Sequence, residues 1–434
     1  MQLVSFNEVN GFAPLNETLV QGRDTGLYGT TDEGGSTFKG TAFRITPQGL
    51  LSVYTFDGTS GTGPCAGFLL GLDGLLRGVT QFGGASNDGI VYSISPHASV
   101  AVIASFDGAN GSTPQAPLVQ GIDGYYYGTT VFGGAHNFGT VFRLAPTGIV
   151  TTLHSFDASV GPQAGALSLV YGPDNTFYGM TNGGGAANLG TIFKITPSGK
   201  FSTLYSFSGG ANGANPLGNL LLASDGNFYG TTQAGGVFNM GTVFRLDTTG
   251  VTVLRSFSGD DGADPASGVI QATDGNLYGT TAGGGETGCG TIFSMALDGT
   301  NFSLLHSFNF ENGCSPWALM QHTDGMFFGT TYSGGASNAC GFAGCGTVFS
   351  QDVGLPPFVT FVRTAGKVGQ TGGILGQGFT GTTSVELNGV PANFTVVSDT
   401  YLTATVPSGA TTGYVTVTTP TGVLTSNVPF HVIQ

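Results

Sequence analysis

The chain has 434 residues, of which 77 are Gly, and only 8% of them are charged, against about 25% in an average soluble domain. This composition excludes a coiled coil and an ordinary helical enzyme. Hydrophobic residues make up 40% of the chain and include 33 Phe and 14 Tyr, which is enough to build a core, so the high Gly content does not indicate disorder.

The formal net charge is −14, from 11 basic and 25 acidic residues. Nucleic-acid binding depends on clustered Lys and Arg, so DNA and RNA are not expected partners. No run approaches the roughly 18 apolar residues of a membrane span, and the opening Met1–Phe6 has no export-signal pattern. Sparse Lys, abundant Thr, Ser and Asn, and clustered Cys favour a mature secreted or cell-surface protein whose leader is absent from this chain.

The first expected element is a strand at residues 3–6, and after it a long sequence repeat dominates the chain. Residues 123–156 read DGYYYGTTVFGGAHNFGTVFRLAPTGIVTTLHSF, and residues 225–257 read DGNFYGTTQAGGVFNMGTVFRLDTTGVTVLRSF. The aromatic anchor of this motif recurs every 49 to 51 residues, with Arg77 in its place in the second copy. The anchor positions are Tyr28, Arg77, Tyr127, Tyr178, Tyr229, Tyr278 and Phe328. The chain therefore holds seven copies.

Each copy contains four short β-type runs separated by turn residues. In the third copy they lie at 117–120, 125–130, 140–144 and 150–156, with Asp123-Gly124 and Pro146-Thr147-Gly148 between pairs of them. Four strands in about 50 residues, repeated seven times, predict a seven-bladed β-propeller at residues 1–353. The last copy stops after its third strand, and Leu3–Phe6 matches the fourth-strand ending Leu153–Phe156. We therefore expect the N-terminal strand to close the last blade.

These YGTT, GG and GTVF segments resemble the GloVer tandem repeats of bacterial secreted or surface proteins, over about residues 1–350. The resemblance implies a repeat β fold and an extracellular location. It implies no established activity.

A second all-β unit is expected at residues 356–434, after Leu355-Pro356-Pro357. Apolar and polar residues alternate in 384–387, 402–406 and 414–417. Together with Gly376–Phe379, Val385–Gly389 and Phe430–Val432, these runs resemble an IPT/TIG immunoglobulin-like domain. The resemblance implies an interaction or spacer module.

Acidic residues recur in the first turn of the repeats, where a carboxylate can accept hydrogen bonds from turn amides, so a structural role is expected. These turn residues are Asp73, Asp123, Asp174, Asp225, Asp274 and Asp324. Cations end the third strand in four copies, at Arg44, Arg143, Lys194 and Arg245. We expect them to pair with the turn carboxylates, the alternative being a ring of cations for an anionic ligand.

Residues that occur once lie mainly in loops expected on one face, opposite the tight turns, where binding groups usually concentrate. The candidate ligand-binding residues are His136, Asn137, Phe238 and Trp317. The candidate catalytic residues are Asp88, His136, Glu286 and Glu311. Three carboxylates could serve glycoside hydrolysis if two lay about 5–9.5 Å apart. Only one of the six His lies in these loops, so a metal centre is not expected.

Asp-rich links at 57–58, 107–111 and 260–264 leave a structural calcium ion as an alternative to having no cofactor. Four Cys are expected to converge, with Cys289 paired to Cys314 and Cys340 to Cys345. A four-Cys zinc site is the competing interpretation. Cys65 lies elsewhere and is expected to take no part.

The sequence thus favours an extracellular binding, adhesion or surface-structural protein whose variable loops contact a glycan or a cell-surface protein. The second hypothesis is a secreted propeller hydrolase or lyase acting on polysaccharide, which rests on analogy between folds.

Overall fold

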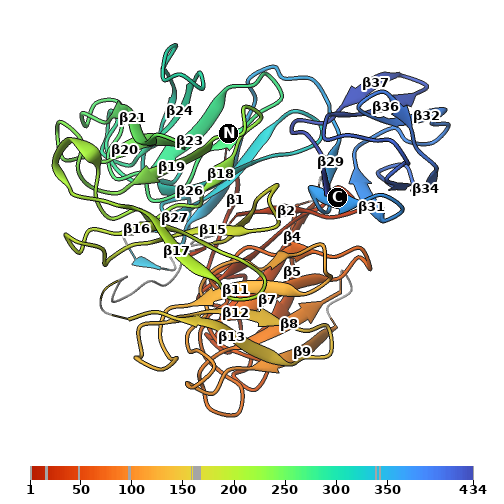
Figure 1. Ribbon diagram of the computed structural model, residues 1–434. Coiled ribbons are helices and arrows are strands. Elements are labelled where there is room, and N and C mark those ends of the chain that lie inside the picture. The colour runs from red at the N-terminus through yellow and green to blue at the C-terminus, as the bar shows by residue number, and fades with distance from the viewer. Residues whose placement is uncertain are drawn as a thin grey trace.

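The structure is a computed structural model that describes residues 2–14, 18–46, 49–95, 99–157, 159, 168–337, 340–341 and 344–433. Regular structure in these residues is β-strand, apart from one short 3-10 helix, η1 (Gly210–Asn212). The strands form two units (Figure 1), which we call the repeat array (residues 2–351) and the C-terminal unit (residues 356–433).

The repeat array is built from four-stranded antiparallel sheets, which we number in chain order. Sheet 1 consists of β2 (Val20–Gln21), β3 (Leu27–Thr31), β4 (Thr41–Thr46) and β5 (Gly49–Thr55). Sheet 2 consists of β6 (Leu69–Leu70), β7 (Leu76–Thr80), β8 (Ile90–Ile94) and β9 (Val100–Ser105). Sheet 3 consists of β10 (Val119–Gln120), β11 (Tyr126–Thr130), β12 (Thr140–Leu144) and β13 (Val150–Ser155).

Sheets 4 to 6 continue the same order. Sheet 4 consists of β14 (Val170–Tyr171), β15 (Phe177–Thr181), β16 (Thr191–Ile195) and β17 (Phe201–Ser206). Sheet 5 consists of β18 (Leu221–Leu222), β19 (Phe228–Thr232), β20 (Thr242–Asp247) and β21 (Gly250–Ser256). Sheet 6 consists of β22 (Ile270–Gln271), β23 (Leu277–Thr281), β24 (Thr291–Met295) and β25 (Ser303–Ser307).

Sheet 7 joins the two ends of the array. It contains β26 (Cys314–Gln321), β27 (Phe327–Ser333), β28 (Thr347–Gln351) and, as its fourth strand, β1 (Gln2–Ser5). β1 runs antiparallel to β28, with Val4 opposite Val348 and Ser5 opposite Thr347. The first strand of the chain therefore covers the edge that the last repeat leaves open, which makes the array a closed ring.

The second and third strands of each sheet carry most of the core. All five residues of β11 are buried, as are four of the five in β12, whereas β13 is only partly buried. A pair of Thr hydroxyls joins the loop ends of these two strands, and Thr130 Oγ1 lies 2.9 Å from Thr140 Oγ1. The same pairing occurs at 31/41, 181/191, 232/242, 281/291 and 331/347.

Paired Gly residues follow the second strand because the loop there approaches the preceding link closely. Gly133 and Gly134 both have positive φ, and a Cβ on Gly133 would lie 2.5 Å from the Gly108 carbonyl oxygen. Only Gly tolerates this backbone conformation and this contact together. We call the side that bears these loops and links the loop face, and the side with the Asp-Gly turns the turn face.

A glutamine clasp joins neighbouring sheets on the turn face. Gln21 Nε2 donates to Thr323 Oγ1 at 2.9 Å, and Thr323 N donates to Gln21 Oε1 at 3.0 Å. This contact links sheet 1 to sheet 7 across 302 residues. Gln271 with Ser224, and Gln321 with Thr273, make the equivalent contact.

The C-terminal unit has two four-stranded sheets and one strand pair. They are β29 (Thr360–Phe361), β31 (Thr371–Leu375), β35 (Tyr401–Thr405) and β34 (Phe394–Ser398); β33 (Val390–Pro391), β32 (Ser384–Leu387), β36 (Val415–Thr419) and β37 (Gly422–Thr425); and β30 (Ala365–Lys367) with β38 (His431–Ile433). The two larger sheets share one core, to which Ile374 and Leu402 contribute from one sheet and Val385 and Val417 from the other.

This unit packs against the turn face of the array. Leu375 and Tyr401 belong to one buried cluster with Tyr28 and Leu76 of sheets 1 and 2. Phe358 N donates to Thr323 O at 3.0 Å, close to the ring-closing clasp. The loop face remains on the other side of the array.

We predict that replacing Gln21 with Ala weakens ring closure. The substitution leaves the fully buried Thr323 without the partner of its N–H and hydroxyl groups, and such a loss costs about 2 kcal/mol. Urea unfolding followed by fluorescence measures the change in the free energy of unfolding. Gln120→Ala is the matched control, because among the described residues the Gln120 amide bonds within its own turn, to Gly124 O at 3.3 Å, and not to a neighbouring sheet. Equal losses in the two variants would contradict a special role for the clasp.

Candidate functional site

The turn carboxylates are bonded within their own repeats. Asp123 accepts hydrogen bonds from Tyr125 N at 3.1 Å and from the Tyr127 hydroxyl at 2.6 Å. Burial, together with this carboxylate, holds the pKa of Tyr127 above its ordinary value. The same Tyr-to-Asp bond occurs at 28/24, 178/174, 229/225 and 278/274. These contacts stabilise the first turn of each repeat.

The second and seventh repeats keep the turn Asp bonded by other means. Arg77 Nη2 lies 2.5 Å from Asp73 Oδ2, and His322 Nδ1 lies 2.9 Å from Asp324 Oδ1. The other ring nitrogen of His322 lies 3.2 Å from Thr25 O, so this side chain also connects sheet 7 to sheet 1.

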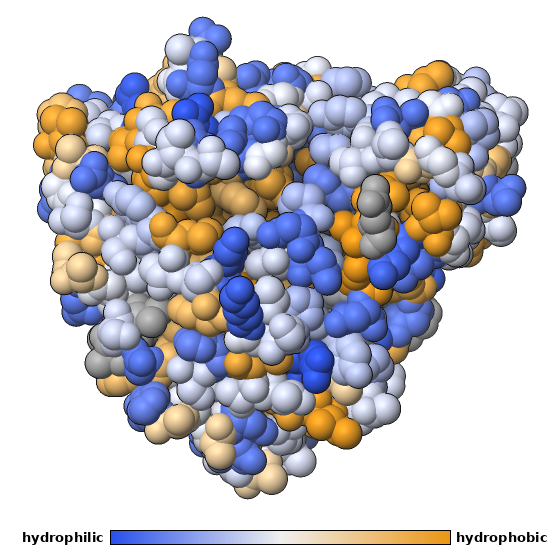
Figure 2. All heavy atoms as spheres, in the orientation of Figure 1, coloured by the Kyte–Doolittle hydropathy of each residue, from blue (hydrophilic) through white to orange (hydrophobic). Residues whose placement is uncertain are grey.

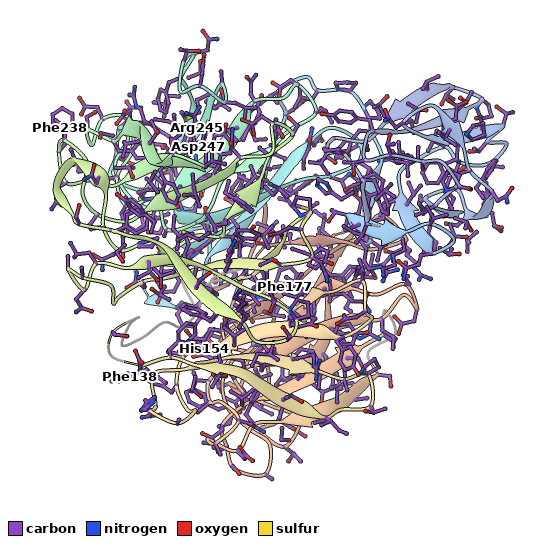
Figure 3. All side chains as sticks on the ribbon, in the orientation of Figure 1. Phe138, His154, Phe177, Phe238, Arg245 and Asp247 are labelled. Carbon is purple, nitrogen blue, oxygen red and sulfur yellow. A yellow bond between two sulfur atoms is a disulfide. The ribbon has the colours of Figure 1, made fainter. Side chains whose placement is uncertain are left out.

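The third-strand cations do not share one partner. Arg44 forms an ion pair with Asp24, an acidic residue in the first turn of its own repeat that was not among the turn residues identified from the sequence. Arg245 instead pairs with Asp247 at 3.1 Å (Figure 3), so the prediction is wrong there. The physical reason is that Asp225 already accepts hydrogen bonds from Tyr229 and Asn227. The Arg143 guanidinium lies over the Tyr125 ring at 4.7 Å.

The loop-face candidates divide into turn residues and exposed residues. Asn137 has a φ of 59°, and its side-chain oxygen accepts a hydrogen bond from Gly133 N at 2.9 Å. Equivalent Asn residues at 87, 188 and 239 make the same contact in other sheets. Asn137 is therefore a repeated turn residue. His136 is exposed, and Phe238 is exposed on the same side of the molecule as Phe138, the left edge in Figure 3.

The candidate catalytic carboxylates do not form one cluster, although the segments of Glu286 and Glu311 adjoin: Glu286 N donates to Ser307 Oγ at 3.4 Å, and Thr287 Oγ1 donates to Phe308 O at 2.6 Å. Asp88 belongs to a loop of sheet 2 and accepts a hydrogen bond from the Ser112 hydroxyl at 2.6 Å. Glu286 lies in a loop of sheet 6, Glu311 lies in the link to sheet 7, and both are exposed. Within the described ranges, no hydrogen bond, ion pair or described cavity joins these carboxylates to one another or to His136.

Trp317 lies at the centre of the ring. It lines a cavity together with residues that lead into the first strands of other sheets, among them Thr18, Gln115, Leu217 and Ala266. The cavity volume is about 30 Å³, room for about one water molecule. The Trp317 carbonyl accepts a hydrogen bond from Thr280 Oγ1 at 2.6 Å, and its indole N–H is buried with no partner among the described residues. Trp317 thus fills the axis.

A chain of side chains near the axis was not identified from the sequence. Gln115 donates to Gln81 at 2.7 Å, and Gln81 donates to Asp32 at 2.6 Å, so three successive sheets are linked. Burial, with a smaller contribution from the Glu33 carboxylate, raises the pKa of Asp32 to about 6. Asp264 is a second such group, with a pKa raised by burial and one buried oxygen that has no partner among the described residues. The sequence signal that could have identified Asp32 and Asp264 is an acidic residue at a position that is uncharged in the other repeats.

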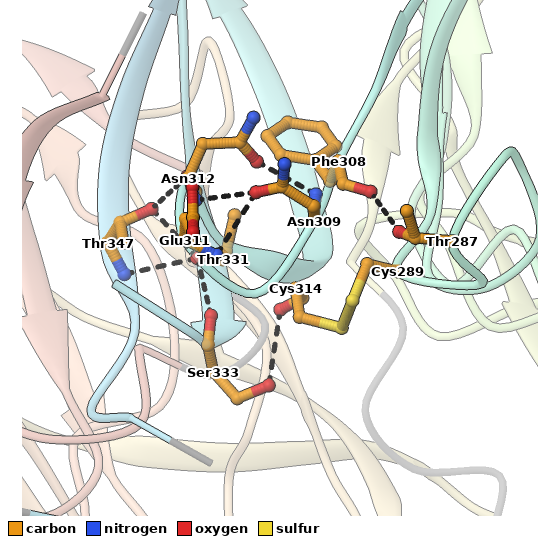
Figure 4. Close-up of a disulfide and its surroundings, with 10 residues drawn as sticks. All are labelled: Thr287, Cys289, Phe308, Asn309, Glu311, Asn312, Cys314, Thr331, Ser333 and Thr347. Carbon is orange, nitrogen blue, oxygen red and sulfur yellow. Dashed lines mark hydrogen bonds between the residues drawn. A yellow bond between two sulfur atoms is a disulfide. The ribbon is translucent and has the colours of Figure 1, made fainter. Parts of the chain in front are cut away.

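Two disulfides lie in the last two repeats. Cys289 pairs with Cys314, and Cys340 pairs with Cys345. The first connects a loop of sheet 6 to the start of β26, beside the Ser333 hydroxyl that donates to Cys314 O at 3.5 Å (Figure 4). The second closes the loop between β27 and β28, where the paired Thr residues are 16 positions apart rather than the 10 of other repeats. Disulfides are consistent with an oxidising, extracellular compartment.

The Asp-rich links use their carboxylates for local hydrogen bonds. Asp57 accepts from Ser60 N at 2.8 Å, Asp107 from Asn110 N at 2.8 Å, and Asp261 from Ser258 N at 2.7 Å. Within the residues that the structure describes, no three His, Cys, Asp or Glu side chains gather as metal ligands. In the same part of the chain, no helix has the length and apolarity to cross a membrane.

A closed ring of repeated four-stranded sheets defines a tandem-repeat β protein. The chain belongs to the Gloeobacter/Verrucomicrobia repeat family, whose model matches residues 1–169, 66–272 and 167–396. No curated protein matches the chain.

Similar solved structures include a candidate 6-phosphogluconolactonase from Bacteroides uniformis ATCC 8492, with 14% identity, a TM-score of 0.46 and coverage of 70% of this chain and 88% of that one. The PQQ-bound aldose sugar dehydrogenase from Streptomyces coelicolor has 14% identity, a TM-score of 0.45 and coverage of 67% and 95%. A gluconolactonase from Xanthomonas campestris has 12% identity, a TM-score of 0.40 and coverage of 65% and 82%. With TM-scores below 0.5, these likenesses support no statement about activity.

We predict that Asp32 makes the protein less stable as the pH rises from about 4 to about 6. Its folded-state pKa is raised from 3.8 to about 6, so the folded protein holds the proton more tightly than the unfolded chain in that window. Asp32→Asn keeps the oxygen that accepts from Gln81 and should raise the free energy of unfolding at pH 7 by on the order of 2 kcal/mol. Near pH 4 it should have little effect.

Urea unfolding at both pH values measures this difference. Asp57→Asn is the control of opposite sign, because hydrogen bonds from the Ser60 amide and hydroxyl lower the pKa of Asp57. Removing this carboxylate should therefore destabilise the protein above pH 4. The prediction would be contradicted if the Asp32→Asn variant and the wild-type protein had the same free energy of unfolding at pH 7.

We also predict that the Cys289–Cys314 disulfide contributes more to stability than the Cys340–Cys345 disulfide. The two links span 25 and 5 residues, and the chain-entropy model gives about 3 kcal/mol for the longer loop and less for the shorter one. Thermal melts of Cys314→Ser and Cys340→Ser should differ accordingly. Thiol titration of denatured, unreduced protein should find one thiol, that of Cys65. Five thiols would overturn both assignments.

Proposed function

We propose that this protein is a secreted or cell-surface recognition protein whose loop face binds a glycan. In this proposal the ring of seven sheets is a seven-bladed β-propeller over residues 1–353, and residues 356–434 are an IPT/TIG immunoglobulin-like domain. A cell-surface protein is the alternative partner for the same face.

The observation that carries the proposal is a set of exposed aromatic side chains on the loop face. Six of the seven aromatic side chains that count as exposed among the described residues lie there: Phe38, Phe82, Phe132, Phe238, Phe310 and Tyr332. Phe38 is 66% exposed and Phe238 is 57% exposed. Exposed aromatic residues concentrated on one side of a soluble protein mark a binding surface, because burial of their rings supplies much of the energy of recognition.

The surface around these rings suits a weakly charged partner. In Figure 2 the visible face mixes hydrophobic and hydrophilic patches, with hydrophobic surface at the left edge, where Figure 3 places Phe238. Only 8% of the chain is charged. Flat aromatic faces with neutral amide and hydroxyl neighbours match the alternating apolar and hydroxyl surfaces of a saccharide.

The second candidate, a polysaccharide hydrolase or lyase, draws support from one group. The raised pKa of Asp32 is the kind of perturbation found in general acids. The axial cavity of about 30 Å³ favours binding over catalysis, because ligand pockets are usually about 300–1,000 Å³.

The test is a polysaccharide panel scored for both retention and release of reducing ends. We expect retention without turnover. The double substitution Phe132→Ala and Phe238→Ala should weaken retention about tenfold or more, since buried aromatic anchors contribute about 2 kcal/mol or more each. Tyr414→Ala is the matched control, an exposed aromatic residue on the C-terminal unit. Turnover abolished by Asp32→Asn would establish the enzyme instead, and equal loss in the control would refute a loop-face site.

A further inference from the structure

The junction between sheets 1 and 2 differs from three of the other junctions on the turn face. In those three junctions the anchor Tyr packs at a tilt against a Phe of the next sheet, with ring centroids 4.0 Å apart for Tyr127/Phe177, 4.3 Å for Tyr178/Phe228 and 4.5 Å for Tyr278/Phe327. Beside Tyr28 the corresponding residue is Leu76, in the same buried cluster. A smaller side chain thus stands where these three junctions carry a ring. Leu277 holds the same place beside Tyr229 at the junction of sheets 5 and 6, so the Leu alone does not set the junction of sheets 1 and 2 apart.

A cavity of about 430 Å³ lies at this junction, lined by Arg23, Asp24, Tyr28, Arg44, Asp73 and Leu76 among others. Its volume falls in the range of small-molecule sites. The side chains of Asp24 and Asp73 are 39% and 47% exposed, so the cavity opens to solvent. The loop-face aromatic residues lie on the opposite side of the array.

Arg23 gives the cavity an uncompensated positive charge. The equivalent residues in the other repeats are uncharged: Leu72, Ile122, Pro173, Ser224, Thr273 and Thr323. The Arg23 guanidinium lies 4.1 Å from the centre of the Tyr401 ring and donates to Leu72 O, which fixes its position. Among the described residues no carboxylate forms an ion pair with Arg23.

The remaining charges at the junction cancel in pairs. Arg44 pairs with Asp24, and Arg77 pairs with Asp73. The Nε–H groups of Arg23 and Arg44 are buried with no partner among the described residues. The Nε–H group of Arg143 in sheet 3 is also buried with no partner among the described residues. An unpartnered Nε–H is therefore not special to this junction, which is distinguished by the cavity and by Arg23. The groups that lack partners are donors, and a ligand must therefore supply acceptors and negative charge.

We propose that this cavity is a binding site for a small hydroxylated carboxylate of the hexuronic acid class. The carboxylate of the ligand contacts Arg23, and its hydroxyl groups donate to the exposed oxygens of Asp24 and Asp73. The proposal is independent of the loop face and of the partner bound there.

The first test is isothermal titration of the full chain with D-glucuronate and with D-glucose. Glucuronate should bind at least about tenfold more tightly than glucose, because a charge-assisted hydrogen bond contributes about 1.5–3 kcal/mol. Arg23→Gln should abolish that preference. Arg143→Gln, at the position in sheet 3 that Arg44 holds in sheet 1, is the control and should leave it unchanged.

A second variant separates lost binding from lost folding. Leu76→Phe introduces the residue found at the equivalent position in sheets 4, 5 and 7, so it should retain or raise the melting temperature while filling the cavity and abolishing glucuronate binding. The proposal is overturned if the wild-type protein binds no glucuronate, if glucose binds equally well, or if binding survives in both Arg23→Gln and Leu76→Phe.

Discussion

The antiparallel pairing of β1 with β28 is the contact on which the rest of the structure depends. Each repeat supplies four strands, but the seventh supplies three, and only the first residues of the chain can complete it. The pairing removes an exposed sheet edge. It also joins residues more than 300 positions apart, so it forms only when the intervening sheets are in place. The Gln21 to Thr323 clasp and the His322 contact to Thr25 O reinforce the same seam, and the Cys289–Cys314 disulfide holds the neighbouring junction.

Once the ring is closed, the residues that recur in the motif satisfy the backbone and the core, and little of their chemistry remains for a ligand. The Asp123 carboxylate is bonded to a turn amide and a Tyr hydroxyl, and the Thr130 and Thr140 hydroxyls bond each other. The departures from the motif are the informative positions. Asp32 introduces a half-buried carboxylate, Arg23 introduces a cation with no ion-pair partner among the described residues, and Leu76 stands where three other junctions place a Phe ring. Each departure has a local energetic cost that the repeat does not require.

The spacing of the motif and the match of Leu3–Phe6 to Leu153–Phe156 were sufficient to predict the all-β fold, the four-stranded unit and the partner of the N-terminal strand, because period and register are local properties of the sequence. The site was harder to predict. Asn137 looked unique in the sequence, yet it makes a turn contact that Asn87, Asn188 and Asn239 share. Arg245 was assigned to the wrong carboxylate, since the choice between Asp225 and Asp247 depends on which acceptor is already occupied. Neither the cavity at Leu76 nor the chain from Gln115 to Asp32 could be predicted, because both depend on side chains of adjacent sheets.

The C-terminal unit packs against one face of the array only, so the two faces of the array differ in what they expose. The C-terminal unit shares buried clusters with sheets 1 to 4 on the turn face, which holds it in place and leaves the loop face uncovered. The axis is closed by Trp317 and by the backbone contact of Gly218 with Gly268, where a Cβ on Gly218 would lie 2.1 Å from Gly268 N. The loop face with its exposed aromatic residues is therefore the side of the array that the C-terminal unit leaves open, whereas the junction that Arg23 marks lies on the turn face. In a chain of net charge −14, an arginine without an ion-pair partner among the described residues reduces the long-range repulsion that an anion meets at this junction.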